Sequence, residues 1–117
     1  MTRKKEIESW MRSLQTSITT GLEQLDGQTQ FTQDKWDRSG GGGGITKVIE
    51  NGRIIEKGGV NFSAVHGKTP EKIGKALGFE ASQLFATGVS IVLHPINPWV
   101  PIIHMNVRYF EMSPNDN

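Results

Sequence analysis

The sequence predicts an α+β fold, in which one antiparallel β-sheet is flanked by helices. Three observations lead to this prediction. Apolar residues near the start recur every three or four positions, whereas several later segments alternate apolar and polar residues. Turn-forming sequences containing Gly, Asn and Pro separate those later segments, as expected for antiparallel neighbours. With 117 residues and 35% hydrophobic content, the chain has enough apolar material for one domain with a modest core.

The first segment, from about Arg3 to Leu25, is expected to form an amphipathic helix that ends at Asp26-Gly27. Its polar face mixes acidic, basic and neutral side chains, so the helix is expected to pack on a sheet or a partner subunit rather than on a membrane. The apolar positions that define the stripe are Ile7, Trp10, Met11, Leu14, Ile18, Leu22 and Leu25.

A run of five glycines, Gly40 to Gly44, follows the polar segment Phe31 to Arg38. Such a run is most often a flexible linker, and it is weak evidence for an anion-binding loop because any glycine run satisfies that pattern. The triplet Gly67-Lys68-Thr69 is not a phosphate-binding loop, since the glycine required five residues earlier is replaced by Phe62. We therefore exclude nucleotide binding.

The segment Ile45 to Lys57 is predicted to form a β-hairpin with a two-residue type I′ turn at Asn51-Gly52. Gly59 to His66 alternates as a third strand, and His66 is expected to be an exposed loop residue rather than a ligand. Thr69 and Pro70 are typical of a helix start, so a short helix is expected to about Leu77.

Two further strands, Ala86 to His94 and Val100 to Met112, are separated by turn-forming residues 95–99. On the second strand, two faces follow from the period of two. The polar residues of one face can be read as an ordinary solvated surface or as a row of functional groups. That face holds Ile102, His104, Asn106, Arg108 and Phe110, and the other holds Ile103, Met105, Val107 and Tyr109.

The alternation suggests a register in which His94 pairs with His104, Val92 with Asn106, and Ser90 with Arg108. Any register that keeps the apolar faces together must pair even positions with even ones, because a one-residue slip turns a strand over. Ser90, His94, His104, Asn106 and Arg108 are therefore predicted to converge on one face of the sheet.

Composition excludes several classes of partner. The net charge of +1, with no basic cluster beyond Arg3-Lys4-Lys5, argues against nucleic acid. The absence of cysteine excludes disulfides and thiolate metal sites and favours a cytoplasmic location. No stretch is apolar for long enough to span a membrane.

With these residues in view, the chain from about Phe31 to Glu111 resembles the oxygen-dependent coproporphyrinogen III oxidase family. Each of the similar blocks is modest alone, but five in this order are specific. The blocks are Trp36-Asp37-Arg38 with Gly40 to Gly44 and Ile45, then Glu56 to Asn61, Gly88-Val89-Ser90, His94 to Pro98, and His104 to Glu111.

The resemblance implies an oxidoreductase of haem biosynthesis that oxidatively decarboxylates two propionates of coproporphyrinogen III to vinyl groups, giving protoporphyrinogen IX with O₂ as oxidant. It also implies a homodimer with a large antiparallel sheet and no organic cofactor. The chain is much shorter than such enzymes, so residues 1–117 are expected to be the N-terminal part of a longer domain. The alternative is a non-catalytic fragment that binds a porphyrin or another polycarboxylate, or only pairs with another subunit.

Carried over by position, the resemblance implies that His104 is the proton donor. Ser90, Asn106, Val107 and Arg108 match substrate-contacting positions. His94 and His104 match histidines that bind a divalent metal, such as Mn²⁺, in bacterial members.

Overall fold

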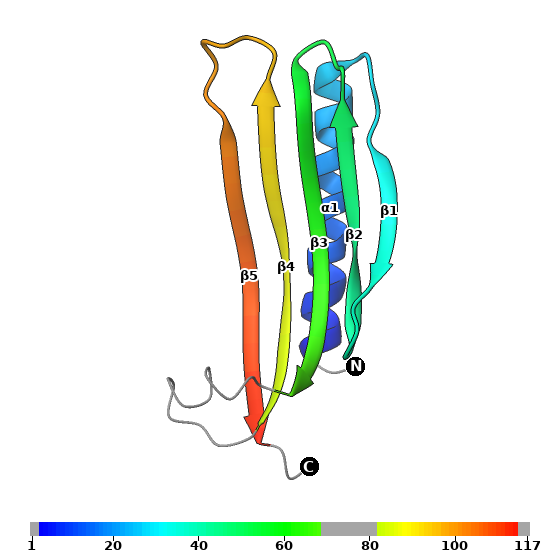
Figure 1. The fold of residues 1–117 in the computed structure, drawn as a ribbon, viewed down its shortest axis with the longest axis vertical. Coiled ribbons are helices and arrows are strands. Elements are labelled where there is room, and N and C mark those ends of the chain that lie inside the picture. Colours follow the sequence, from blue (N-terminus) through cyan, green and yellow to red (C-terminus); the bar gives the residue numbers. More distant parts are fainter. Residues whose placement is uncertain (1–2, 69–81, 115–117) are drawn as a thin grey trace.

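A computed structural model describes residues 3–68 and 82–114 of the chain. These residues form one helix and one five-stranded sheet (Figure 1). The elements are α1 (Arg3–Asp26), β1 (Thr32–Asp37), β2 (Gly42–Glu50), β3 (Ile55–Lys68), β4 (Ser82–Pro95) and β5 (Ile103–Pro114).

The five strands lie in sequence order, and each is antiparallel to its neighbours. Helix α1 runs along the strands on one face of the sheet and packs against β3 and β4 (Figure 1). The predicted α+β class with an antiparallel sheet is confirmed. The predicted helix at residues 69–77 lies outside the described residues.

Helix α1 confirms the predicted start and extends the predicted end by one residue. Its buried face includes Met11, Gln15 and Thr19. Gln15 is 1% exposed, and its Nε2 donates to the backbone carbonyls of Ile45 at 2.7 Å and Val60 at 2.9 Å. These two hydrogen bonds satisfy a buried amide and fix the helix against β2 and β3.

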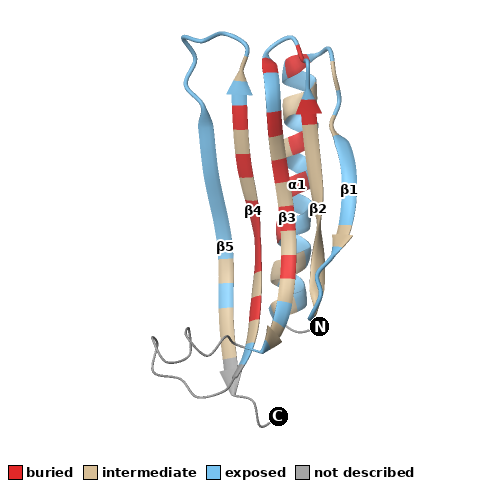
Figure 2. Ribbon diagram, in the orientation of Figure 1, coloured by how far each residue is buried: buried red, intermediate tan, exposed pale blue. Residues whose placement is uncertain are grey.

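The core lies between α1 and the two central long strands (Figure 2). Alternate residues of β3 and β4 point toward the helix, as the period of two requires. The buried side chains of this cluster are Met11, Val60, Phe62, Ala64, Val89, Ile91 and Leu93. The predicted strand Gly59 to His66 is part of β3, which also includes the second arm of the predicted hairpin.

The flexible-linker interpretation of the glycine run is wrong, because Gly42, Gly43 and Gly44 belong to β2. They pair on one side with β1, which was not predicted as a strand, and on the other with β3. Gly40, Gly41 and Gly42 have positive φ values of 102°, 132° and 85°, so the turn between β1 and β2 suits glycine. Pairing on both sides thus orders a sequence whose composition alone favours disorder.

The predicted two-residue type I′ turn at Asn51-Gly52 is also wrong. Only Asn51 has a positive φ, at 57°, and the Gly52 N–H donates to the Ile55 carbonyl at 2.9 Å in a longer loop. The buried carboxylate of Asp26 at the end of α1 shapes this loop. It accepts hydrogen bonds from the backbone N–H groups of residues 28, 53, 54 and 55, at distances between 2.9 and 3.2 Å.

Those hydrogen bonds hold the pKa of Asp26 well below its usual value, with the bond from the Ile55 N–H as the largest cause and burial opposing it. The charged carboxylate therefore ties the end of α1 to the β2–β3 connection.

Within the described ranges, no helix has the length and apolar character needed to cross a membrane.

Candidate active site: the open face of the sheet

Helix α1 covers one face of the sheet, and no described element covers the other, which we call the open face (Figure 1). The core residues of β4 have odd numbers, so its even residues point to the open face. The register then places the even residues of β5 there too. Ser90, His94, His104, Asn106 and Arg108 therefore share this face, as the sequence predicted.

The predicted register is wrong by two residues. Val92, not His94, pairs with His104, while Ser90 pairs with Asn106 and Gly88 with Arg108. A two-residue slip leaves every side chain on its own face, so apolar alternation cannot distinguish the two registers.

A row of polar side chains crosses all five strands of the open face. Cross-strand pairing joins its members in the order Asp34, Thr46, Asn61, Ser90 and Asn106. Directly opposed side chains have Cβ atoms about 4.5–5.5 Å apart. The row is therefore a continuous line of hydroxyl and amide groups with one carboxylate at its β1 end.

A second row runs beside the first and ends at Arg108. Its members are Trp36, Gly44, Ser63, Gly88 and Arg108. Two of the three central residues are glycines, so few side-chain atoms project from this part of the open face. Arg108 is exposed, and its guanidinium offers a planar set of donors that matches a carboxylate.

The two histidines lie at the other end of β4 and β5. His104 is opposite Val92, so His94 is its diagonal neighbour on the same face, at a typical Cβ separation of about 7–8 Å or slightly less. Both are exposed. His94 also lines a hollow of about 420 Å³ with Lys57, Gly59 and Val92.

This placement brings two imidazoles to one region of the open face but forms no complete metal site among the described residues. Among the described residues, no group of three or more His, Asp or Glu side chains could hold a metal ion. Two protein ligands seldom suffice for a protein metal site.

Val107 differs from the other predicted site residues. It pairs with Val89 of the core, so its side chain points to the helix side of the sheet. Only its backbone could contact a ligand on the open face.

The sequence prediction missed Thr46 and Asn61, which are central in the polar row. Both are partly buried, and they are joined by a hydrogen bond of 2.7 Å between Thr46 Oγ1 and Asn61 Oδ1. Asn61 lies between the core residues Val60 and Phe62, so its alternation alone assigns it to the open face. Its neighbours in the row depend on the register of three strands and have no local signal.

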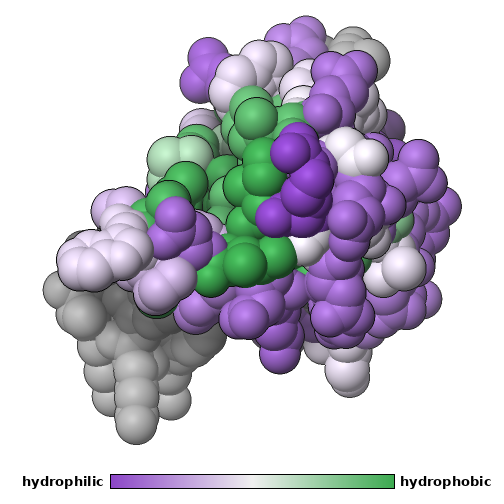
Figure 3. All heavy atoms as spheres, turned by 90° about the horizontal axis from the view of Figure 1, so that it is seen from above, coloured by the Kyte–Doolittle hydropathy of each residue, from purple (hydrophilic) through white to green (hydrophobic). Residues whose placement is uncertain are grey.

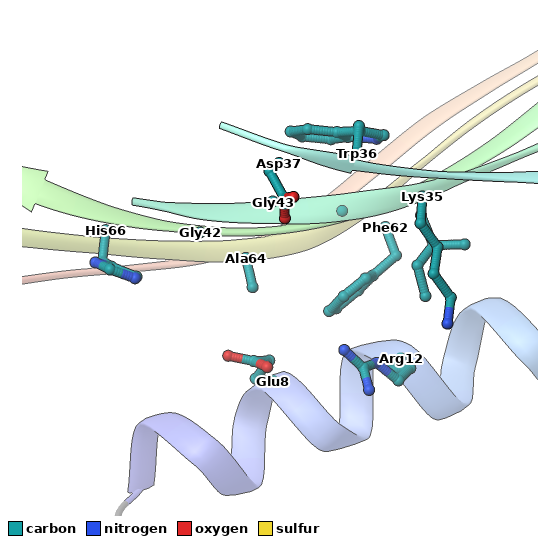
Figure 4. A pocket seen from close by; sticks show the side chains of 12 residues that line it. Glu8, Arg12, Lys35, Trp36, Asp37, Gly42, Gly43, Phe62, Ala64 and His66 are labelled. Carbon is teal, nitrogen blue, oxygen red and sulfur yellow. The ribbon is translucent and has the colours of Figure 1, made fainter. Parts of the chain in front are cut away.

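A different hollow, of about 370 Å³, lies on the helix side near the glycine run (Figure 4). Glu8 and Arg12 of α1 point into it from below, and Phe62 and His66 of β3 point into it from the sheet (Figure 4). His66 is exposed as predicted, but it lies within β3 rather than in a loop. None of the residues predicted for the site lines this hollow.

The helix side also has an apolar surface where α1 ends and β5 begins. Figure 3 shows apolar side chains gathered at this end of the sheet. A hollow of about 420 Å³ there is lined by residues that include Leu22, Leu25, Ile54, Val100 and Ile103. The two sides of the sheet therefore differ sharply, and the open face alone gathers the predicted polar groups.

The open face combines guanidinium, imidazole, amide and hydroxyl groups around a part of the sheet where two glycines leave room for a ligand. This combination is typical of a surface that binds an anionic organic ligand rather than a hydrocarbon.

Comparisons with known proteins identify the family of this chain. The family model described as coproporphyrinogen III oxidase matches residues 6–117. The chain is 45% identical over 111 residues to the oxygen-dependent coproporphyrinogen-III oxidase of Prochlorococcus marinus strain SARG, covering 93% of this chain and 32% of the relative. It is 48% identical over 103 residues to the same enzyme of strain NATL1A, covering 86% and 30%.

The chain therefore belongs to the coproporphyrinogen III oxidase family. It spans about a third of the length of the curated relatives that it matches.

Proposed function

We propose that this chain forms one wall of the substrate site of an oxygen-dependent coproporphyrinogen III oxidase. The observation that carries the proposal is the convergence of Ser90, His104, Asn106 and Arg108 on one uncovered sheet face, in a chain of this family. The relatives are named for this substrate and for oxygen dependence.

The reaction converts each of two propionate side chains to a vinyl group. The bond between the carboxyl carbon and its neighbour breaks to release CO₂, and the carbon next to the pyrrole loses hydrogen. Each step removes two electrons and two protons from the neutral acid, which O₂ accepts to give H₂O₂. Protoporphyrinogen IX is the product.

Arg108 binds a substrate propionate through paired, charge-assisted hydrogen bonds. Ser90 and Asn106, directly opposite each other, orient the same or a neighbouring carboxylate. The imidazole of His104 is suited to transfer a proton during decarboxylation, because an imidazole can both accept and donate a proton under physiological conditions. Val107 contributes through its backbone.

His94 and His104 supply two ligands of a divalent cation such as Mn²⁺, and the remaining ligands come from outside the described residues. A bound cation would supply positive charge beside the substrate. Calorimetric titration with Mn²⁺ tests this part. Binding that is unchanged in His94→Ala would contradict it.

The cellular setting follows from the family resemblance and the composition. We infer that the complete enzyme has no organic cofactor, acts as a homodimer and resides in the cytoplasm, a reducing compartment that suits 117 residues without cysteine. Light scattering on the complete enzyme tests the dimer, and a monomer at all concentrations would contradict it.

The test of substrate binding uses coproporphyrin III, the stable oxidised form of the substrate, in a fluorescence titration. Arg108→Ala is expected to weaken binding at least tenfold, because a hydrogen-bonded ion pair to a carboxylate is lost. Lys35→Ala is the matched control, since it removes a positive charge from β1 on the helix side of the same sheet. Equal binding by the wild-type chain and Arg108→Ala would contradict the proposal.

One wall of a site is not expected to turn over by itself, so the chemical role is tested in a full-length enzyme of the family that contains this chain. That enzyme is incubated aerobically with coproporphyrinogen III, with and without Mn²⁺. His104→Asn is expected to abolish turnover while coproporphyrin III still binds. Turnover that survives this substitution would remove His104 from the proton-transfer role.

A further inference from the structure

A chain of hydrogen bonds on the open face connects three strands. The indole Nε1 of Trp36, on β1, donates to Thr46 Oγ1 on β2 at 3.0 Å. Thr46 Oγ1 in turn donates to Asn61 Oδ1 on β3 at 2.7 Å. Trp36, Thr46 and Asn61 are all partly buried, so the protein covers part of this hydrogen-bonded series from water.

The chemistry of the donors fixes the direction of this chain. An indole nitrogen can only donate, so Thr46 uses a lone pair for Trp36 and keeps its single proton for Asn61. That proton requires an acceptor, which is the amide oxygen of Asn61. With the amide reversed, Thr46 would accept two hydrogen bonds and its own proton would lose this partner.

The amide nitrogen of Asn61 is consequently turned away from Thr46. Within residues 3–68 and 82–114, Nδ2 of Asn61 donates to no protein group, and no buried side-chain nitrogen or oxygen lacks a partner. The Nδ2 group is thus a donor that remains accessible from the open face.

The neighbours of Asn61 show what this donor can bind. Asn61 is directly opposite Ser90, and Ser90 is directly opposite Asn106. Three neutral hydrogen-bond donors therefore lie side by side on β3, β4 and β5. A carboxylate can accept several such bonds at once.

The carboxylate of Asp34 ends the same row on β1, next to Thr46. It repels an anionic group placed at that end and leaves the β3–β5 end, nearer to Arg108, as the favourable position.

We propose that Asn61 is a further carboxylate-binding residue of this site, and that Trp36 and Thr46 are positioning residues that hold its amide nitrogen toward the ligand. The inference rests on the proposed function, which makes the carboxylate a propionate of coproporphyrinogen III. The site residues predicted from the sequence all lie on β4 and β5. The inference extends the site to three residues on β1, β2 and β3.

The hydrogen-bond chain can be tested without any ligand. The protein has three tryptophans, and Trp10 and Trp99 are 58% and 92% exposed, so their indole N–H signals serve as internal references in a ¹H–¹⁵N NMR spectrum. Thr46→Val should shift the Trp36 signal and speed its exchange with water, whereas Thr46→Ser should preserve both. An unchanged Trp36 signal in Thr46→Val would overturn the positioning role.

The binding role is tested by titration with coproporphyrin III. Asn61→Asp keeps the acceptor for Thr46 but replaces the donor by a negative charge, so we expect at least a tenfold loss of affinity. Thr46→Val should also weaken binding, by severalfold, and Thr46→Ser should restore affinity to within about twofold of wild type.

The outcomes separate this inference from the proposed function. Wild-type binding that depends on Arg108 but is unaffected by Asn61→Asp would overturn the role of Asn61 and leave the proposed function standing. A wild-type chain that does not bind coproporphyrin III would contradict both. Equal losses of coproporphyrin III affinity in Thr46→Ser and Thr46→Val would overturn the positioning role. The packing of the side chain at residue 46, rather than its hydroxyl group, would then determine affinity.

Discussion

The position of β5 depends on a glycine in the neighbouring strand. Gly88 of β4 is opposite Arg108, and a Cβ atom at residue 88 would overlap the carbonyl oxygen of Val107 and lie 3.1 Å from the Cα of Arg108. Both are backbone atoms, so no side-chain rotation relieves the overlap. Gly88→Ala must therefore move β5, which carries His104, Asn106 and Arg108.

We expect this overpacking to lower the free energy of unfolding by about 1–3 kcal/mol. That loss is a large share of the roughly 5–15 kcal/mol that stabilises a domain. Gly59→Ala is the matched control on the adjacent strand, because the nearest atom to a Cβ there, the Lys47 carbonyl oxygen, is 3.8 Å away. The control should be neutral or stabilise by up to about 1 kcal/mol, since alanine restricts the unfolded chain.

Urea unfolding followed by circular dichroism measures both variants, and hydrogen exchange locates the effect. Gly88→Ala should lower the midpoint, speed exchange of the β5 amides and weaken coproporphyrin III binding. The reasoning is refuted if Gly88→Ala is as stable as wild type, or if Gly59→Ala is destabilised equally.

Three further predictions concern the helix side. Gln15→Glu should destabilise by about 2–4 kcal/mol, more than Gln15→Met, because it removes two buried donors and adds a buried charge; urea unfolding measures both, and equal losses would contradict this. The lowered pKa of Asp26 contributes stability above its ordinary value of 3.8 that is lost as the pH falls below it, so the wild-type chain should lose more stability on acidification than Asp26→Asn; parallel pH profiles would contradict this. Gly21→Ala should raise thermal stability by up to about 1 kcal/mol, since a Cβ there meets nothing within 4 Å; a lower melting temperature would contradict this.

The helix and the division of residues between the two faces could be predicted because both are local properties. The stripe that includes Met11 repeats with the helical period, and the core residues of β4 alternate with Ser90 and His94. Each pattern lies within one segment, so no knowledge of distant contacts is needed.

The register, the glycine strand and the β2–β3 loop depend on distant contacts. A two-residue slip between β4 and β5 preserves both faces, so alternation cannot detect it. Gly43 is ordered by pairing with Asp37 on one side and Ala64 on the other, which overrides its low strand propensity. The loop after Asn51 follows the carboxylate of Asp26, which is distant in sequence.

The polar row shows the same limit at the site. Ser90, Asn106 and Arg108 were found because one hairpin joins their strands. Thr46 and Asn61 were missed because nothing within β2 or β3 distinguishes them from neighbouring polar residues such as Lys47 and Ser63. Only the pairing of β2, β3 and β4 brings them into line with Ser90.

The central claim is that the open face, rather than the helix side, binds the tetrapyrrole. Methyl NMR during titration with coproporphyrin III tests it directly, because the aromatic macrocycle shifts the signals of methyl groups beneath it. Val48 and Val92 point to the open face, whereas Val89 and Val107 point to the helix side. Of these four valines, we predict large shifts for Val48 and Val92 only, and shifts confined to Val89 and Val107 would contradict the claim.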